Sequence, residues 1–111
     1  MAGAYDDRDG VIWLDGAFVP WREAKVHVLS HALHYASSVF EGERAYGGVI
    51  FKSREHTDRL LKSCDYLDIP HPRPAEEIEA AKAAALRESG LSDAYIRPVV
   101  WRGSGPDMGV A

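Results

Sequence analysis

Two dipeptides in this sequence carry strong tight-turn signals, and they constrain the fold more than any other feature. They are Asp15-Gly16 and Gly47-Gly48, and each separates two short segments rich in apolar residues. Glycine adopts a positive φ without strain, which two-residue turns between antiparallel strands require. The sequence therefore predicts two hairpins, formed by strands at 11–14 and 17–21 and by strands at 43–46 and 49–52.

A helix is expected directly after the second hairpin. Ser53 is expected to be its N-cap, because a serine hydroxyl accepts a hydrogen bond from the free N–H groups of the first turn. Apolar residues then recur at helical spacing, at Leu60, Leu61, Cys64 and Leu67. Pro70 is expected to end the helix, since the residue before a proline disfavours helical backbone.

A second helix is expected between Pro74 and Gly90. Acidic residues lie near its start, at Glu76, Glu77 and Glu79, where the positive end of the helix dipole favours them. Gly90 fits a C-terminal cap, because such caps commonly need a residue in the left-handed conformation. This segment has the clearest start and end signals in the chain.

The remaining segments complete a prediction of the fold class. Residues 30–42 mix helix formers with serine and glycine, so one or two helical turns are expected there. Residues 93–101 are rich in β-branched and aromatic side chains and are expected to form one strand. Two hairpins, a further strand and two amphipathic helices predict an α+β fold, in which the helices cover one face of an antiparallel sheet.

Composition and charge restrict the class of partner. The chain has 111 residues, enough for one small domain with a single core. Its net charge of -4 and its lack of a Lys or Arg run argue against nucleic acid and acidic membranes, and favour small-molecule ligands. Cys64 is the only cysteine, so no internal disulfide is expected, and no apolar run reaches the roughly 20 residues that cross a bilayer. We therefore expect a cytoplasmic protein.

The sequence divides into three parts. Residues 1–10 form a polar leader, 11–102 carry the predicted α+β domain, and 103–111 form a glycine-rich loop or the start of an interdomain linker. A glycine-rich loop that leaves a strand usually leads to another element of structure. We therefore expect a second domain that this chain does not include.

Three histidines raise the question of a metal site. His27, His31 and His34 have the i, i+4, i+7 spacing that would align them on one helix face. With Glu41 or Glu43 they would suit zinc. The β-rich residues before them and the serines after them argue against one continuous helix. Hydrogen bonds from the imidazoles to the backbone are the favoured interpretation, and no metal is predicted.

Three segments together resemble a known family. They are "AKVHVLSHALHYASSVFEGERAY", "REHTDRL" and "AYIRP". In order and spacing, over about residues 12–111, they are similar to the N-terminal domain of the branched-chain amino acid aminotransferases, which are pyridoxal-phosphate enzymes of fold type IV. The resemblance implies transfer of the amino group of Leu, Ile or Val to 2-oxoglutarate. Another fold-type IV enzyme, such as D-amino acid aminotransferase, is an alternative, although it shares the "REHTDRL" pattern only loosely.

The resemblance implies roles for three polar residues. Arg59 matches the arginine that binds the cofactor phosphate, a task suited to the forked donors of a guanidinium. Arg97 matches the arginine that meets the distal carboxylate of glutamate or 2-oxoglutarate, and Tyr95 the tyrosine whose hydroxyl helps to fix the substrate's own carboxylate. Tyr95 and Arg97 are two positions apart on a predicted strand, so both should lie on one face of the sheet.

The resemblance also implies an apolar substrate pocket and a dimer. The matching residues are Tyr35, Phe40, Gly42 and Val110. Phe40 would line the pocket, and Gly42 is a position where a side chain would obstruct it. Tyr35 and Val110 would reach the site of the neighbouring subunit, so a homo-oligomer, at least a dimer, is implied.

The lysine that the resemblance requires has no match. In the family, a lysine that forms a Schiff base with the cofactor and an acid that pairs with its pyridine nitrogen both come from the second domain. No catalytic residue is therefore expected in these 111 residues, which alone are expected to be inactive. A non-catalytic binding or dimerisation module with the same fold is the alternative from another class.

Overall fold

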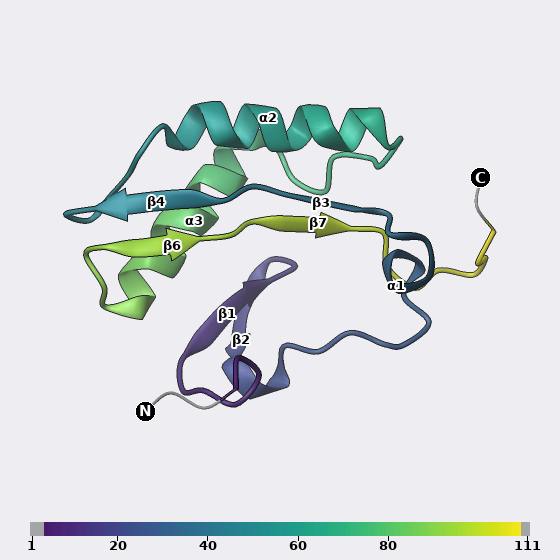
Figure 1. Ribbon diagram of the computed structural model, residues 1–111, viewed down its shortest axis with the longest axis horizontal. Helices are drawn as coiled ribbons and strands as arrows, with labels where there is room; N and C mark the ends of the chain where they lie inside the picture. Colours follow the sequence, from purple (N-terminus) through teal and green to yellow (C-terminus); the bar gives the residue numbers. More distant parts are fainter. Residues whose placement is uncertain (1–3, 110–111) are drawn as a thin grey trace.

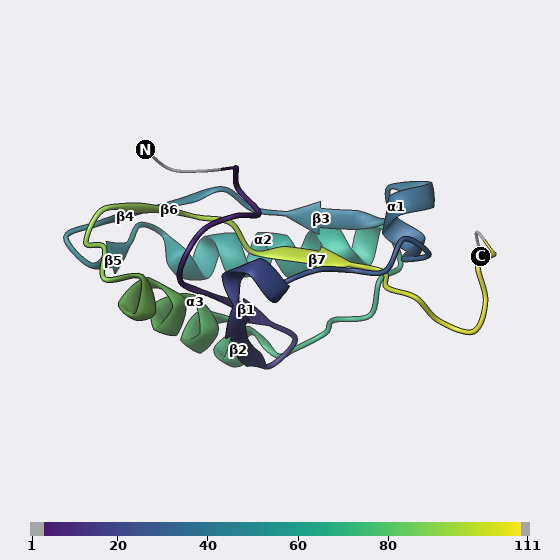
Figure 2. The same cartoon turned by 90° about the horizontal axis from the view of Figure 1, so that it is seen from below.

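A computed structural model describes residues 4–109 as a long strand ribbon with the two long helices on one side (Figures 1 and 2). The ribbon has two antiparallel pairs placed end to end. They are β3 (Ser38–Phe40) with β7 (Val99–Trp101), and β4 (Glu43–Tyr46) with β6 (Ala94–Ile96). Phe40 faces Val99 and Glu43 faces Ile96, so one register runs through both pairs without a shift. The predicted α+β fold is confirmed.

A proline interrupts the ribbon between its two halves. The Glu41 N–H donates to the Pro98 carbonyl at 3.1 Å, but Pro98 has no N–H to give a bond in return. The prediction of one strand over residues 93–101 is therefore wrong, because this position separates β6 from β7. On its other edge, β4 pairs with β5 (Val49–Ile50).

Both predicted hairpins are present. The first joins β1 (Val11–Leu14) to β2 (Ala17–Pro20), and the second joins β4 to β5. All four turn residues have positive φ, from 48° at Asp15 to 101° at Gly16. The second strand of each hairpin ends earlier than predicted. Trp21–Glu23 form the short 3-10 helix η1 instead, and Phe51 begins a turn.

The segment before β4 was predicted only in part. One helical turn, α1 (His31–Tyr35), is present and ends at Ala36, which has a φ of 56°. Helical turns do not continue to residue 42, because Ser38–Phe40 form β3. The strand that pairs with β3 is β7, which lies about sixty residues further along the chain. A local sequence pattern cannot reveal a partner at that distance.

Both predicted long helices are present, but the predicted N-cap of the first one is wrong. The first, α2 (Ser53–Tyr66), has Lys52 at its N-cap position, and the hydroxyl of Ser53 donates to Glu79 instead of capping the helix. The helix also ends before Pro70, because Asp68 adopts a left-handed conformation.

The second helix is α3 (Ala75–Ser89). It starts after Pro74 and ends at Gly90, whose φ of 72° fits the predicted cap.

The helices bury alternate residues of the ribbon. Leu60 and Cys64 of α2 pack with Ile69 and with Val100 of β7, and Val39 of β3 borders this core. Burial raises the pKa of the Cys64 thiol, so this side chain is a protonated packing group. The β1–β2 hairpin packs against α3, as Figure 2 also shows. None of the helices within residues 4–109 has the length and apolarity needed to cross a bilayer.

A buried ion cluster joins α3 to β4. The Lys82 side chain is 4% exposed, and its ammonium lies 2.8 Å from Glu43 Oε1 and 3.2 Å from Glu79 Oε2. It also donates to the Ser53 carbonyl at 2.9 Å. Glu43 Oε2 has no hydrogen-bond partner within residues 4–109, so Lys82 is the main compensation for a fully buried carboxylate.

Lys82→Met should therefore destabilise the protein strongly. The substitution leaves Glu43 buried without its cation, and breaking a buried pair in this way costs about 3–5 kcal/mol. Urea unfolding followed by circular dichroism measures the loss. Lys62→Met, at an exposed position of α2, is the matched control and should change little. Equal stability of the two variants would contradict this role of Lys82.

Candidate functional site

Four of the predicted site residues lie on the face of the ribbon that the helices leave open. Side chains alternate along β3 and β4, so Phe40 and Gly42 face away from the helices, while Glu41 and Glu43 are buried beneath them. The register places Tyr95 opposite Arg44 and carries Arg97 to the position opposite Gly42. Tyr95 and Arg97 are both exposed, as a shared open face requires.

Gly42 leaves the space that the Tyr95 hydroxyl occupies. A Cβ atom at position 42 would lie 2.8 Å from the Tyr95 Oη and 3.3 Å from its ring. Real Cβ contacts are essentially never that short, so a side chain here would displace Tyr95. Glycine at this position thus permits the close approach of the Tyr95 hydroxyl, and no positive φ is involved.

Two guanidinium groups and two aromatic rings surround Gly42. Arg97 lies over the Phe40 ring, 3.8 Å from its centroid, and Arg44 lies 5.8 Å from the centroid of Tyr95. Within residues 4–109, neither arginine forms an ion pair with a carboxylate of the chain. The face therefore combines apolar surface with positive charge that is available to an anion.

Tyr35 lies apart from this group, at the end of the ribbon that carries α1. Its ring centroid is 4.5 Å from that of His31, a buried imidazole. His31 Nε2 lies 2.8 Å from the Gly109 carbonyl and so donates to it, which leaves Nδ1 to accept from the Ser37 hydroxyl at 2.6 Å. The loop that leads to Val110 is thus held against α1 as far as Gly109, and Val110 itself lies outside the described residues.

Arg59 lies on the inner side of the ribbon, with a buried carboxylate as its partner. Its Nε is 2.8 Å from Glu41 Oε2, and its Nη2 is 2.7 Å from Glu41 Oε1. His56 Nδ1 lies 2.7 Å from the same Oε1. Glu41 is 4% exposed, whereas the Arg59 side chain is 67% exposed, so the buried partner holds one side of an otherwise accessible guanidinium.

The carboxylate of Glu41 stays ionised through these contacts. The hydrogen bonds from Arg59 lower the pKa of Glu41 below its ordinary value of 4.5; burial opposes this effect, and His56 adds to it. The same pair raises the pKa of Arg59 further above its ordinary value. Both partners are therefore charged at neutral pH.

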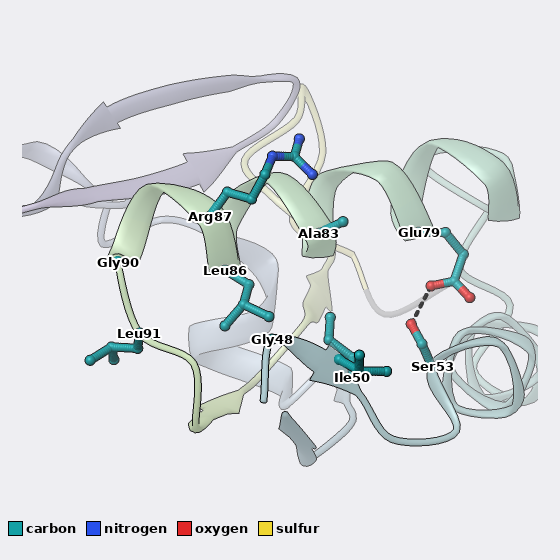
Figure 3. Close-up of a pocket in the computed structure, with 10 residues that line it drawn as sticks. Gly48, Ile50, Ser53, Glu79, Ala83, Leu86, Arg87, Gly90 and Leu91 are labelled. Carbon is teal, nitrogen blue, oxygen red and sulfur yellow. Dashed lines mark hydrogen bonds between the residues drawn. The ribbon is translucent and has the colours of Figure 1, made fainter. Parts of the chain in front are cut away.

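The chain also has an open groove that contains none of the predicted site residues. It lies between α3 and the β4–β5 hairpin, with Ile50, Leu86 and Leu91 among its apolar lining (Figure 3). The hydrogen bond from Ser53 to Glu79 closes one end. These groups belong to the packing of α2 on α3.

The three histidines of the metal hypothesis have separate partners. His27 Nδ1 accepts from the Leu29 N–H, and His34 Nε2 lies 2.8 Å from the Val28 carbonyl. His31 binds Ser37 and Gly109 as described above. No cluster of three or more His, Cys, Asp or Glu side chains suited to a metal ion occurs in the described part of the chain.

Comparison with known proteins defines the class of this chain. The family model of amino-transferase class IV matches residues 38–109, which include the ribbon, both long helices and the open face. The chain belongs to the class IV aminotransferase family.

Curated relatives narrow this assignment within the family. The chain is 52% identical over 102 residues to the branched-chain-amino-acid aminotransferase of Pseudomonas aeruginosa, a match that covers 88% of this chain and 33% of that protein. It is 48% identical over 92 residues to a probable branched-chain-amino-acid aminotransferase of Rickettsia felis, covering 83% of this chain and 32% of that protein. The chain thus spans about a third of the length of the curated relatives that it matches.

Solved structures give the same result for the fold. The branched-chain amino acid aminotransferase of Escherichia coli superposes with a TM-score of 0.88 at 41% identity, over 94% of this chain and 36% of that one. The branched-chain amino acid aminotransferase of T.th., complexed with N-(5'-phosphopyridoxyl)-L-glutamate, gives a TM-score of 0.86 at 46% identity, over 93% of this chain and 36% of that one. In sequence and fold, the chain corresponds to the N-terminal domain of these enzymes.

Sequence reasoning did not assign the two partners of Arg59. The sequence suggested Glu41 only as a possible metal ligand, and it assigned no role to His56. One signal was available: an acidic residue between Phe40 and Gly42 must face the opposite side of a strand from both. A carboxylate on the helix-covered side needs a cation, and Arg59 of the next helix is a candidate.

The stability that Glu41 contributes should depend on pH. Because its folded-state pKa is lowered, this stabilisation is present above the ordinary carboxyl pKa and is lost as the pH falls through the folded-state value. Glu41→Gln should therefore unfold more easily than wild type at about pH 7, and the difference should shrink toward about pH 3. Urea midpoints at a series of pH values measure it. A difference that is constant with pH would argue against an ionised, paired Glu41.

Proposed function

We propose that this chain is the substrate-recognising N-terminal domain of a branched-chain amino acid aminotransferase, which moves the amino group of Leu, Ile or Val to 2-oxoglutarate. The observation that carries the proposal is the open face, where Phe40 and Tyr95 supply apolar surface and Arg97 supplies a charge that forms no ion pair within residues 4–109. The similar structures of the T.th. enzyme include complexes with a phosphopyridoxyl-glutamate and with 4-methylvaleric acid. One ligand is a dicarboxylate adduct and the other a branched aliphatic acid, the two chemistries that this face combines.

Each residue has a distinct task in this proposal. The Phe40 ring contacts the aliphatic side chain of the substrate and excludes water from it. The Tyr95 hydroxyl, in the space that Gly42 leaves, donates to the substrate's own carboxylate. Arg97 pairs with the second carboxylate that only glutamate and 2-oxoglutarate carry. One face thus accepts a neutral and an anionic side chain in turn.

Arg59 suits the phosphate of pyridoxal 5'-phosphate. Its guanidinium is accessible and fixed on one side, and forked N–H donors match phosphate oxygens. When bound, the cofactor supplies an electron sink for the change of bonding at the amino acid's Cα. Lys82, the buried lysine, is held in its ion cluster on the inner side of the ribbon. As the resemblance implies, we assign the cofactor-binding lysine to a second domain.

A dimer is part of the proposal. Tyr35 is 46% exposed at one end of the ribbon, and the loop that precedes Val110 is held against the same helix by His31. This arrangement suits a pair of residues that act in the site of a second copy.

The buried thiol of the only cysteine is compatible with a reducing compartment, and we propose the cytoplasm.

Arg97→Ala tests the recognition of the dicarboxylate in the intact enzyme. We expect kcat/KM for glutamate to fall by about 30-fold and that for leucine by less than about threefold, because only glutamate loses a charge partner. Steady-state kinetics of both half-reactions measure the ratio. Arg87→Ala, an exposed arginine on α3, is the matched control and should change neither value. Equal losses for both substrates would contradict the role of Arg97.

Gly42→Ala tests the position of the Tyr95 hydroxyl. The added Cβ displaces Tyr95, which in this proposal holds the carboxylate that leucine and glutamate both carry. We therefore expect kcat/KM to fall by about tenfold or more for both substrates. Gly103→Ala is the control, since a Cβ at that position meets nothing within 4 Å. A crystal structure of Gly42→Ala with Tyr95 unmoved, or unchanged kinetics, would contradict the proposal.

A further inference from the structure

The contacts of Arg59 point to a function for the two residues that touch it. We propose that Glu41, assisted by His56, is a positioning residue: it fixes the guanidinium of Arg59 so that the remaining donors point toward an anionic phosphate. This inference rests on the proposed role of Arg59 as the phosphate ligand. Neither Glu41 nor His56 is itself expected to touch the cofactor.

The donors of Arg59 divide into two sets. A guanidinium has five N–H groups in a planar fork. Glu41 takes the Nε side, through Nε and one N–H of Nη2, at 2.8 and 2.7 Å. The two N–H groups of Nη1 and the second of Nη2 bind no other residue within residues 4–109. One N–H of Nη1 and the second N–H of Nη2 form a second fork directed away from Glu41, and two parallel donors of this kind match a phosphate edge.

Glu41 is itself held from three sides. Its backbone N–H donates to the Pro98 carbonyl at 3.1 Å, which fixes its place on the ribbon. Arg59 and His56, three residues apart on α2, both bind its Oε1 at 2.7 Å. A carboxylate that is 4% exposed and bound in this way has few alternative rotamers. It can therefore restrict Arg59, a long and 67% exposed side chain that would otherwise sample many.

Net charge and positioning predict opposite effects of removing Glu41 on phosphate binding. Glu41 carries a negative charge beside the proposed phosphate ligand, so its removal would strengthen phosphate binding if only the net charge mattered. If Glu41 acts by orienting Arg59, its removal weakens phosphate binding although the net charge becomes more positive. The sign of the change therefore separates the two interpretations.

The measurement compares two ligands that differ only in the phosphate. Pyridoxal 5'-phosphate and pyridoxal carry the same aldehyde and ring, so the ratio of their dissociation constants isolates the contribution of the phosphate. The constants are measured by absorbance titration of the intact protein after removal of the cofactor. A loss of fold at Glu41 weakens both ligands together, whereas a loss of positioning changes the ratio.

For Glu41→Gln we expect binding of pyridoxal 5'-phosphate to weaken by about tenfold, and that of pyridoxal by less than about twofold, because Arg59 must then be ordered by the ligand. Asp58→Asn is the matched control. It removes a carboxylate that lies 3.0 Å from Arg54 on the same helix, and it should leave the preference for the phosphorylated ligand unchanged. His56→Gln, which keeps Glu41, should lower this preference by about threefold and covers the case in which Glu41→Gln does not fold.

Arg59→Ala separates this inference from the function on which it rests. If Arg59→Ala leaves the preference for the phosphorylated ligand unchanged, the phosphate is bound elsewhere and the proposed role of Arg59 fails. If Arg59→Ala abolishes that preference while Glu41→Gln and His56→Gln leave it unchanged or raise it, Arg59 is the ligand and its positioning by Glu41 is overturned. A fall of the preference in all three variants, and not in Asp58→Asn, supports the inference.

Discussion

Two carboxylates on the covered side of the ribbon, Glu41 between β3 and β4 and Glu43 in β4, tie both long helices to it. Glu41 and Glu43 are both buried, and a buried carboxylate without a cation is too costly to retain. Arg59 of α2 meets the first and Lys82 of α3 meets the second. Each contact therefore joins one long helix to the ribbon, in addition to the apolar packing.

The ribbon also gives the domain two chemically different sides. On the covered side, Arg59 and Lys82 are each matched by a carboxylate of the ribbon. On the open side, Arg44 and Arg97 lie on aromatic rings and have no carboxylate partner within residues 4–109. The alternation of a β-strand thus separates charge that stabilises the fold from charge that is available to a ligand.

Local signals predicted the turns and the second helix, and non-local contacts decided the rest. The turn dipeptides Asp15-Gly16 and Gly47-Gly48 and the segment from Pro74 to Gly90 act over a few residues, so both hairpins and α3 could be predicted from them. Strand β3 could not, because its partner β7 is distant in sequence. Ser53 looked like a helix cap, but Glu79 of the other helix takes its hydroxyl. The grouping of Phe40, Gly42, Tyr95 and Arg97 on one face agrees with the alternation rule, whereas the partners of Arg59 required the fold.

The close approach of Tyr95 to Gly42 has a consequence for engineering of the substrate range. Gly42 carries only a hydrogen atom at the point where Tyr95, from the opposite side of the ribbon, places its phenol. The residues at positions 42 and 95 therefore cannot be varied independently. Substitutions at the two positions should show strong epistasis, since a smaller residue at 95 removes the obstacle that a larger residue at 42 would meet. Libraries that change one position at a time would therefore miss the combinations in which the face is reshaped without a clash.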